Sequence, residues 1–161
     1  MNDTPSSTMG FLDQKGELYS LEIFNERRGI DIVVYTSSPH IQKTKVGYAF
    51  SMLDSENGLR LTDLKIEEQR AIVIHRTGFF SFLRPTKREI RNFQGLGIGT
   101  QILTFMIESA KKQAIKRIYG EIVEVDYPKN PKLPQWYKSL GFKVEMTDGN
   151  SRIKGLISME L

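Results

Sequence analysis

The chain has 161 residues, 39% of them apolar, which is enough for one ordinary hydrophobic core and short for two, so we expect a single domain over residues 1–161. It contains no cysteine, which excludes disulfides, thiolate metal sites and an acyl-thioester intermediate on the protein. The formal net charge of +4 is modest and the two signs are mixed along most of the chain, which weighs against a dedicated nucleic-acid-binding arm.

The first residues, M-N-D-T-P-S-S-T-M-G, lack the positive end and the apolar run of a secretory leader. No apolar run anywhere approaches the roughly 20 residues of a membrane span. We therefore expect a flexible start over residues 1–16, no membrane partner and a cytoplasmic location. Alternating apolar residues then predict one hairpin from residues 18–24 and 30–36, and a second from residues 45–52 and 59–66.

Residues 92–100, N-F-Q-G-L-G-I-G-T, hold three glycines within five residues and lead into the clearest helical periodicity, which begins at Ile98 and extends to Ala114. Glycines before a helix leave the first-turn amides open and permit positive φ angles, and both features suit a phosphate group. The alternative is a tight connection that needs glycine only for packing. The pattern fits neither a P-loop, since no lysine follows Gly99, nor the spacing of a Rossmann fingerprint.

The remaining segments complete a β-loop-α-β unit and a small antiparallel end. Residues 118–123 predict a strand parallel to the strand that precedes the helix. A short helical segment follows between residues 130 and 140, and alternating apolar residues over 142–146 and 153–161 predict two antiparallel strands.

Four features in this order resemble the GNAT superfamily of acyl-CoA-dependent N-acetyltransferases. Gln94, Gly97 and Gly99 match the family's pyrophosphate loop, Q/R-x-x-G-x-G/A. The segment L-T-D-L-K-I-E occupies the position of its central strand, and W-Y-K-S-L-G-F is similar to its Y-x-x-x-G-F ending. Asn130 stands seven residues before Tyr137, as an asparagine and a tyrosine often do in the family's active site.

The resemblance implies an α/β (α+β) fold with a mixed, mostly antiparallel central sheet that carries the acyl-CoA-binding β-loop-α-β unit. It also implies an N-acetyltransferase that moves an acetyl group from acetyl-CoA, as co-substrate and without a metal, to a primary amine of a small molecule or peptide by direct attack in a ternary complex. The cofactor-binding residues that it implies are Leu64, Lys65, Ile66, Gln94, Gly95, Leu96, Gly97, Ile98, Gly99, Thr100, Asn130 and Tyr137.

The same resemblance makes Tyr137 the candidate general acid for the leaving thiolate; the alternative is a core aromatic beside Trp136 and Phe142. Asn130, followed by proline, also fits a helix cap. Glu67 and Glu121 are the candidate bases that would deprotonate the amine, and each has the alternative of a solvated or ion-paired carboxylate. His75 ranks below both as a candidate base.

Two departures from the family stand out. The segment 24–45 is too short and too strand-like for the two helices that form part of the family's acceptor site, and an insert over residues 69–93 separates the central strand from the glycines. The apolar insert is expected to pack over the sheet or against a second subunit of a homodimer, as an acceptor wall, or merely to extend the core.

Two other functions compete with catalysis. One is a non-catalytic acyl-CoA-binding sensor or assembly module of the same fold. The other is a nucleic-acid binder, which ranks last because the insert is too apolar for a single-strand platform. A nucleic-acid binder would use the basic residues Arg84, Lys87, Arg88 and Arg91. The alternatives for these residues are contact with the 3′-phosphate of the cofactor and a solvated face.

Overall fold

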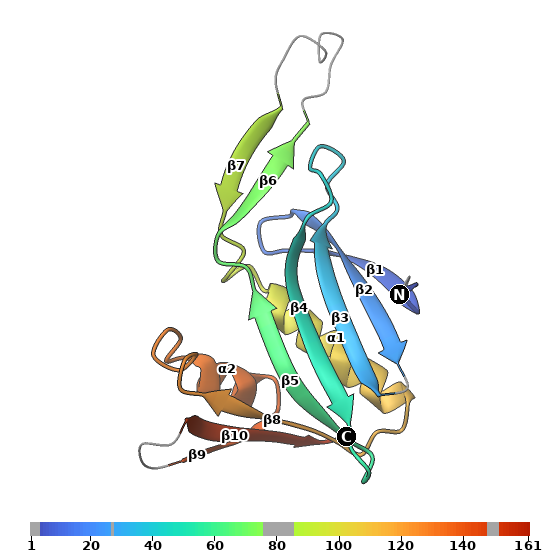
Figure 1. Ribbon diagram of the computed structural model, residues 1–161, viewed down its shortest axis with the longest axis vertical. Coiled ribbons are helices and arrows are strands. Elements are labelled where there is room, and N and C mark those ends of the chain that lie inside the picture. Colours follow the sequence, from blue (N-terminus) through green and yellow to red (C-terminus); the bar gives the residue numbers. More distant parts are fainter. Residues whose placement is uncertain (1–3, 27, 76–85, 148–151) are drawn as a thin grey trace. The chain divides into compact units, whose positions relative to one another are not determined.

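The structure is a computed structural model that describes residues 4–26, 28–75, 86–147 and 152–161 (Figure 1). In chain order its elements are β1 (Ser7–Leu12), β2 (Leu18–Glu26), β3 (Gly29–Thr36), β4 (Lys45–Leu53), β5 (Gly58–Ile66), β6 (Arg70–Ile74), β7 (Lys87–Arg91), α1 (Ile98–Lys112), β8 (Arg117–Val123), α2 (Leu133–Ser139), β9 (Lys143–Met146) and β10 (Ile153–Glu160). These elements confirm both predicted hairpins, the long helix, the short helix and the two final strands.

The larger sheet has the hydrogen-bonded order β1-β2-β3-β4-β5-β8-β10-β9, and β6 and β7 form a sheet of their own. β5 and β8 pair in parallel, whereas the pairs β1–β2, β3–β4, β8–β10, β9–β10 and β6–β7 are antiparallel. The predicted fold class, α+β with a mixed and mostly antiparallel sheet, is therefore confirmed. No helix among the described residues is long and apolar enough to cross a membrane.

The chain divides into two compact units. The first unit comprises Met1–Asn25, Asp31–Ala49 and Leu64–Ile102, and the second comprises Glu26–Ile30, Phe50–Asp63 and Leu103–Leu161. Strands β3, β4 and β5 and helix α1 each contribute residues to both units. The expectation of a single domain over the whole chain stays a prediction.

In the first unit, β1 corrects the expected flexible start over residues 1–16. Its residues pair antiparallel with β2 in the register Ser7↔Ile23 to Leu12↔Leu18. The Phe11 ring stacks on Tyr19 with centroids 5.4 Å apart. Most of β1 is exposed, so its own apolar pattern is weak and pairing with β2 holds it in place. A local pattern could not reveal a strand whose order depends on its partner.

The two ends of the insert form a pair of strands, β6 and β7, within the first unit. β6 and β7 pair from Arg70↔Arg91 to Ile74↔Lys87, and the Gln42 amide donates to the Val73 carbonyl over 2.9 Å, which ties β6 to the β3–β4 loop. The apolar residues Phe79, Phe80 and Phe82, on which the acceptor-wall prediction rested, lie outside the described residues, as does Arg84.

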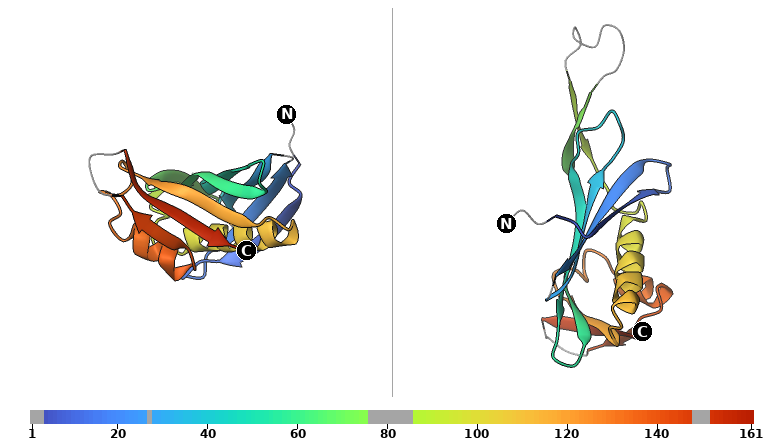
Figure 2. Two further views of the ribbon diagram at one scale, coloured as in Figure 1. Left: turned by 90° about the horizontal axis from the view of Figure 1, so that it is seen from below. Right: turned by 90° about the vertical axis from the view of Figure 1, so that its right-hand side faces the viewer.

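The second unit contains the β5–β8 pair and the antiparallel end of the sheet. The parallel register covers Gly58–Leu61 with Arg117–Gly120 and stops there, although β5 continues to Ile66 and β8 to Val123. β10 lies between β8 and β9 and pairs with both, as the orange and red strands in Figure 2 show. The core of this unit includes Leu59, Ile118, Ile122 and Ile157, each of which is at most 2% exposed.

Candidate functional site

Residues 94–100, called the glycine loop below, turn the chain into α1. Gly95 has φ of 70° and Gly97 has φ of 83°, both in the left-handed region that favours glycine. The Gln94 amide donates to Asn92 Oδ1 over 2.8 Å, which closes the turn before the first of these glycines. The sequence thus uses glycine here for backbone conformation, as a phosphate-binding nest requires.

Helix α1 begins at the end of the glycine loop with an uncompensated positive end. The Gln101 amide donates to the Gly97 carbonyl over 3.1 Å, so the helical hydrogen-bond pattern reaches back into the glycine loop. The first turn of α1 contains no acidic residue, whereas Lys111 and Lys112 lie in its last turn. An anion at the start of α1 would therefore meet amide donors and the helix dipole without a competing carboxylate.

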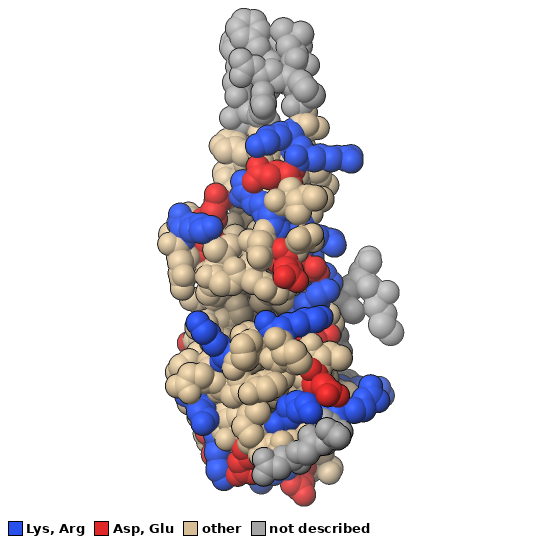
Figure 3. Space-filling view, turned by 90° about the vertical axis from the view of Figure 1, so that its left-hand side faces the viewer, with Lys and Arg blue, Asp and Glu red and all other residues tan. Residues whose placement is uncertain are grey.

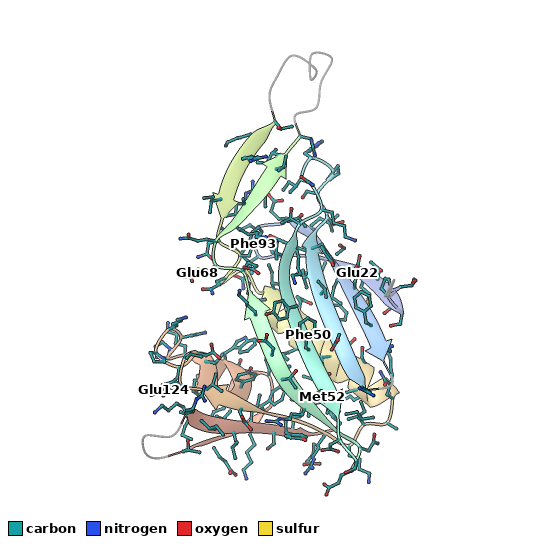
Figure 4. All side chains as sticks on the ribbon, viewed as in Figure 1. Glu22, Phe50, Met52, Glu68, Phe93 and Glu124 are labelled. Carbon is teal, nitrogen blue, oxygen red and sulfur yellow. The ribbon has the colours of Figure 1, made fainter. Side chains whose placement is uncertain are left out.

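The end of β5 joins the glycine loop within the first unit. The Phe93 amide donates to the Glu67 carbonyl over 3.1 Å, and the Glu67 amide donates to the Val46 carbonyl over 2.9 Å. The first of these bonds brings the two ends of the insert together, through Glu67 directly after β5 and Phe93 before the glycine loop. Phe93 is 2% exposed. Figure 4 labels Phe93 and Glu68 on these two segments. Residues 64–66 and the glycine loop thus belong to one unit, as the resemblance requires.

The Glu67 carboxylate is loosely paired. Its Oε2 lies 3.8 Å from Lys65 Nζ, and its side chain is 16% exposed. A contact of this length leaves lone pairs of the carboxylate available for another donor. The Glu67 carboxylate can therefore accept a further hydrogen bond.

The basic residues before the glycine loop are partly neutralised. Glu89 accepts from Lys87 Nζ over 3.1 Å and from Arg91 Nε over 2.7 Å. These two contacts, that of Arg91 first, lower the pKa of Glu89. Arg91 also lies 3.8 Å from Glu17, while Arg88 is exposed. On the face that Figure 3 shows, basic and acidic side chains are interspersed. The ion pairs of Lys87 and Arg91 agree with the solvated-face alternative.

Tyr137 lies on α2 in the second unit and is 6% exposed. Its ring packs on Trp136 with centroids 4.8 Å apart and on Phe142 with centroids 5.5 Å apart, and these three residues are called the α2 aromatic cluster below. Burial, and to a smaller extent the charge of Asp126, raises the pKa of Tyr137 well above its ordinary value. Its hydroxyl is therefore protonated at neutral pH, a requirement for any proton donor.

Asn130 is exposed and lies in the turn before α2. Its amide donates to the Asp126 carbonyl over 3.0 Å, and its carbonyl accepts from the Leu133 amide over 3.0 Å. The predicted helix cap at Asn130 is wrong, because the cap lies two residues later, at Lys132, and Pro134 stands in the first helical positions. A second proline three residues after Pro131 supplies the same signal and decides the start.

Glu121 lies on β8 and is paired. Its Oε1 accepts from Arg60 Nη2 on the parallel neighbour β5 over 2.9 Å. The ion-paired alternative for Glu121 is thus the one that the structure has. Among the residues described, no group of three or more acidic or histidine side chains is placed to hold a metal ion.

One residue beside the glycine loop had no signal in the sequence. A Cβ on Gly97 would lie 3.7 Å from Gln14 Nε2 and 3.8 Å from Gln14 Cγ, so the Gln14 side chain lies against this glycine. Gln14 belongs to the turn between β1 and β2, within the segment expected to be flexible. Only the pairing of β1 with β2 fixes its position.

Residues 90–142, which contain the glycine loop, α1 and α2, match the model of the acetyltransferase (GNAT) family. An acetyltransferase of the GNAT family from Staphylococcus aureus Mu50 is similar in structure, with a TM-score of 0.55 at 14% identity over 82% of this chain and 68% of that one. The chain has the GNAT acetyltransferase fold. The resemblance seen in the sequence is confirmed.

Other GNAT structures are similar to the same degree. The ribosomal-protein-S18-alanine N-acetyltransferase from Escherichia coli has a TM-score of 0.54 at 12% identity over 84% of this chain and 71% of that one. The PaiA N-acetyltransferase from Thermoplasma acidophilum, solved in complex with coenzyme A, has a TM-score of 0.53 at 17% identity over 81% of this chain and 60% of that one. No curated protein sequence matches the chain.

Proposed function

We propose that the protein binds acetyl-CoA through the glycine loop and transfers its acetyl group to a primary amine by direct attack in a ternary complex. The observation that carries this proposal is the pair of positive-φ glycines at the acid-free start of α1, within the segment that matches the GNAT family. The coenzyme A complex of the PaiA N-acetyltransferase supports the same ligand.

The residues of the glycine loop suit the diphosphate of this co-substrate. Amides between Gly95 and Gly99 are proposed to donate to it, and Gly95 and Gly97 provide the backbone conformation that points such donors toward one anion. The backbone of residues 64–66, at the end of β5, is proposed to hold the pantetheine arm and the oxygen that becomes negative during attack. Asn130 is proposed to contact the coenzyme A chain.

When bound, acetyl-CoA supplies the thioester carbonyl that the amine attacks and the sulfur that leaves. Tyr137 is proposed to donate its hydroxyl proton to that sulfur. A raised pKa keeps this proton in place until negative charge develops on the sulfur. Its cost is a smaller driving force for proton transfer, so the tyrosine acts only together with the developing charge.

Glu67 is the stronger of the two proposed bases. An alkylamine with a pKa of about 10.4 must lose a proton before attack, directly or through water. Within the described residues, the Glu67 carboxylate lies 3.8 Å from Lys65 Nζ, whereas the Glu121 carboxylate accepts from Arg60 over 2.9 Å. Glu121 is thus already bonded to a cation, whereas the longer contact leaves Glu67 able to accept a hydrogen bond from an amine or a water.

The acceptor is proposed to be a primary amine of a small molecule or peptide. The GNAT fold hosts many acceptors and does not by itself select among them. A homodimer, a cytoplasmic location and the role of the 69–93 insert as an acceptor wall remain predictions.

The experiment combines binding with turnover on the full chain. Calorimetric titration with acetyl-CoA is expected to show binding, and a free-thiol assay over small amines and peptide N-termini is expected to show thiol release with at least one of them. Titration with ATP is the matched control, because a site that binds any nucleotide phosphate would bind ATP and acetyl-CoA equally. Equal binding of ATP and acetyl-CoA, or no binding of either, would contradict the proposal.

A non-catalytic acyl-CoA-binding module is the second candidate. Two observations favour it: Tyr137 packs within an aromatic cluster, and Glu121 is ion-paired, so two of the three proposed catalytic side chains have structural roles. Binding of acetyl-CoA without thiol release from any amine class would select this candidate.

A further inference from the structure

The turn between β1 and β2 is held rigidly by one buried carboxylate. Asp13 is 8% exposed, and its Oδ1 accepts from the amides of Lys15 and Glu17 over 2.8 and 2.9 Å. Its Oδ2 accepts from the Tyr19 hydroxyl over 3.2 Å. A turn with its backbone bonded to one carboxylate in this way has few conformations to lose when a ligand binds.

This turn is anchored to the residues that lead into the glycine loop. The Tyr19 ring meets the Phe93 ring edge-on with centroids 6.3 Å apart, and Phe93 is buried directly before Gln94. Glu17 also lies 3.8 Å from Arg91. The anchoring uses an aromatic pair and an ion pair from two segments more than 70 residues apart in the sequence, so the turn and the loop form one assembly within the first unit.

Gln14 is the residue of this turn that reaches the glycine loop. Its side chain is exposed, and a Cβ on Gly97 would lie 3.7 Å from its Nε2. The amide group of Gln14 therefore lies beside the backbone whose conformation suits a phosphate. A glutamine amide offers two N–H donors and no charge.

We propose that Gln14 is a further diphosphate-binding residue, which donates from Nε2 to a phosphate oxygen held at the Gly95–Gly97 backbone. This inference rests on the proposed function. In the resulting site, the β1–β2 turn contributes a side-chain donor and the glycine loop contributes backbone donors. A neutral donor adds a hydrogen bond to an anion, and these bonds are stronger than those between neutral groups.

The test uses the full chain with three substitutions of graded charge, titrated with coenzyme A. Gln14→Ala is expected to weaken binding about 3- to 10-fold, because one charge-assisted hydrogen bond is lost at an exposed site. Gln14→Glu is expected to weaken it more than about 10-fold, because it adds a negative charge beside the diphosphate. Gln14→Lys is expected to retain wild-type affinity or to exceed it.

Two controls locate the effect. Gln42→Glu makes the same change at an exposed glutamine of the β3–β4 loop and is expected to bind coenzyme A as the wild type does. Dephospho-coenzyme A, which keeps the diphosphate and lacks the 3′-phosphate, is expected to show the same graded losses.

Three results would overturn the inference: wild-type affinity in Gln14→Glu, an equal loss in Gln42→Glu, or losses that vanish with dephospho-coenzyme A. Failure of the wild type itself to bind coenzyme A would instead overturn the proposed function. Thermal unfolding of Gln14→Ala close to that of the wild type is expected, since the side chain is exposed.

Discussion

The glycine loop and the α2 aromatic cluster differ in which part of the chain defines them. The loop is defined by backbone: two positive φ angles and a helix start without acidic residues. The cluster is defined by side chains, and Tyr137 packs between rings that would hold any tyrosine on α2 in place. A structural explanation therefore suffices for the cluster but not for Gly95, where a Cβ would meet no atom within 4 Å, or for Gly97, where it would meet the exposed Gln14 side chain.

Buried aromatic residues and glycines of positive φ differ in how much of their presence packing explains. Burial explains an aromatic residue without any ligand, because its apolar surface is removed from water. Burial of apolar surface explains the positive φ of neither Gly95, which has open space, nor Gly97, which lies beside the polar Gln14 side chain, so their backbone conformation needs another reason. The proposed binding function rests on the loop for this reason, and the proposed catalytic function needs the tests that follow.

The largest expected effect tests the cluster. Tyr137→Phe removes only the hydroxyl and is expected to lower kcat by about 100-fold or more, since a general acid contributes roughly that factor. Calorimetry is expected to show unchanged acetyl-CoA affinity. Tyr119→Phe, which removes a hydroxyl bonded to Asp54 over 3.0 Å, is the control and should keep its turnover. A wild-type kcat in Tyr137→Phe would mean that Tyr137 serves packing and does not act as the general acid.

A second prediction separates the two carboxylates. Glu67→Gln is expected to lower kcat by about 10- to 100-fold in the free-thiol assay, because the amide cannot accept the proton of the amine. Glu121→Gln is expected to change kcat less than about 3-fold, because this carboxylate already pairs with Arg60 in an exposed position. A larger loss in Glu121→Gln than in Glu67→Gln would instead identify Glu121, on β8, as the base.

A third prediction tests the loop. Gly97→Ala forces a residue with a Cβ to adopt φ of 83°, at a cost of about 1–2 kcal/mol, and the loop is expected to relax away from its ligand conformation. Acetyl-CoA affinity should fall about 10-fold by calorimetry. Gly141→Ala imposes the same strain at φ of 92° after α2 and should lower stability without this loss of affinity. Equal losses in both variants would mean that stability, not the loop, controls binding.

The smallest effect compares the two buried tyrosines, Tyr19 in the first unit and Tyr137 in the second. Burial is the largest cause that raises the pKa of each, and the Asp13 carboxylate adds to it at Tyr19. Because the unfolded chain releases these protons first, this contribution to stability is complete below about pH 10 and is lost as pH rises further, by up to about 1.4 kcal/mol per pH unit for each tyrosine.

Urea unfolding between about pH 9 and pH 11 measures this loss. Tyr19→Phe and Tyr137→Phe should each make the decline shallower. Asp13→Asn should do so only through Tyr19, which would show as no further change when it is combined with Tyr19→Phe. A decline of the same slope in all variants would contradict the assignment.

The local patterns of the sequence predicted most elements of the fold correctly. Residue alternation predicted β2 to β5 and β8 to β10, and the recurrence from Ile98 predicted α1. β1 was missed because its exposed residues carry little pattern of their own, and the start of α2 was misplaced because two prolines offer the same signal.

By itself the sequence determined the glycine loop, the order of the elements and the resemblance to GNAT proteins, because periodicity and backbone conformation are properties of consecutive residues. Only the tertiary structure decided that Arg60 pairs with Glu121, that Phe93 returns the insert to Glu67, and that Gln14 lies against Gly97. Each of these contacts joins residues far apart in the chain. Their distances depend on how the strands pair, which no local pattern records.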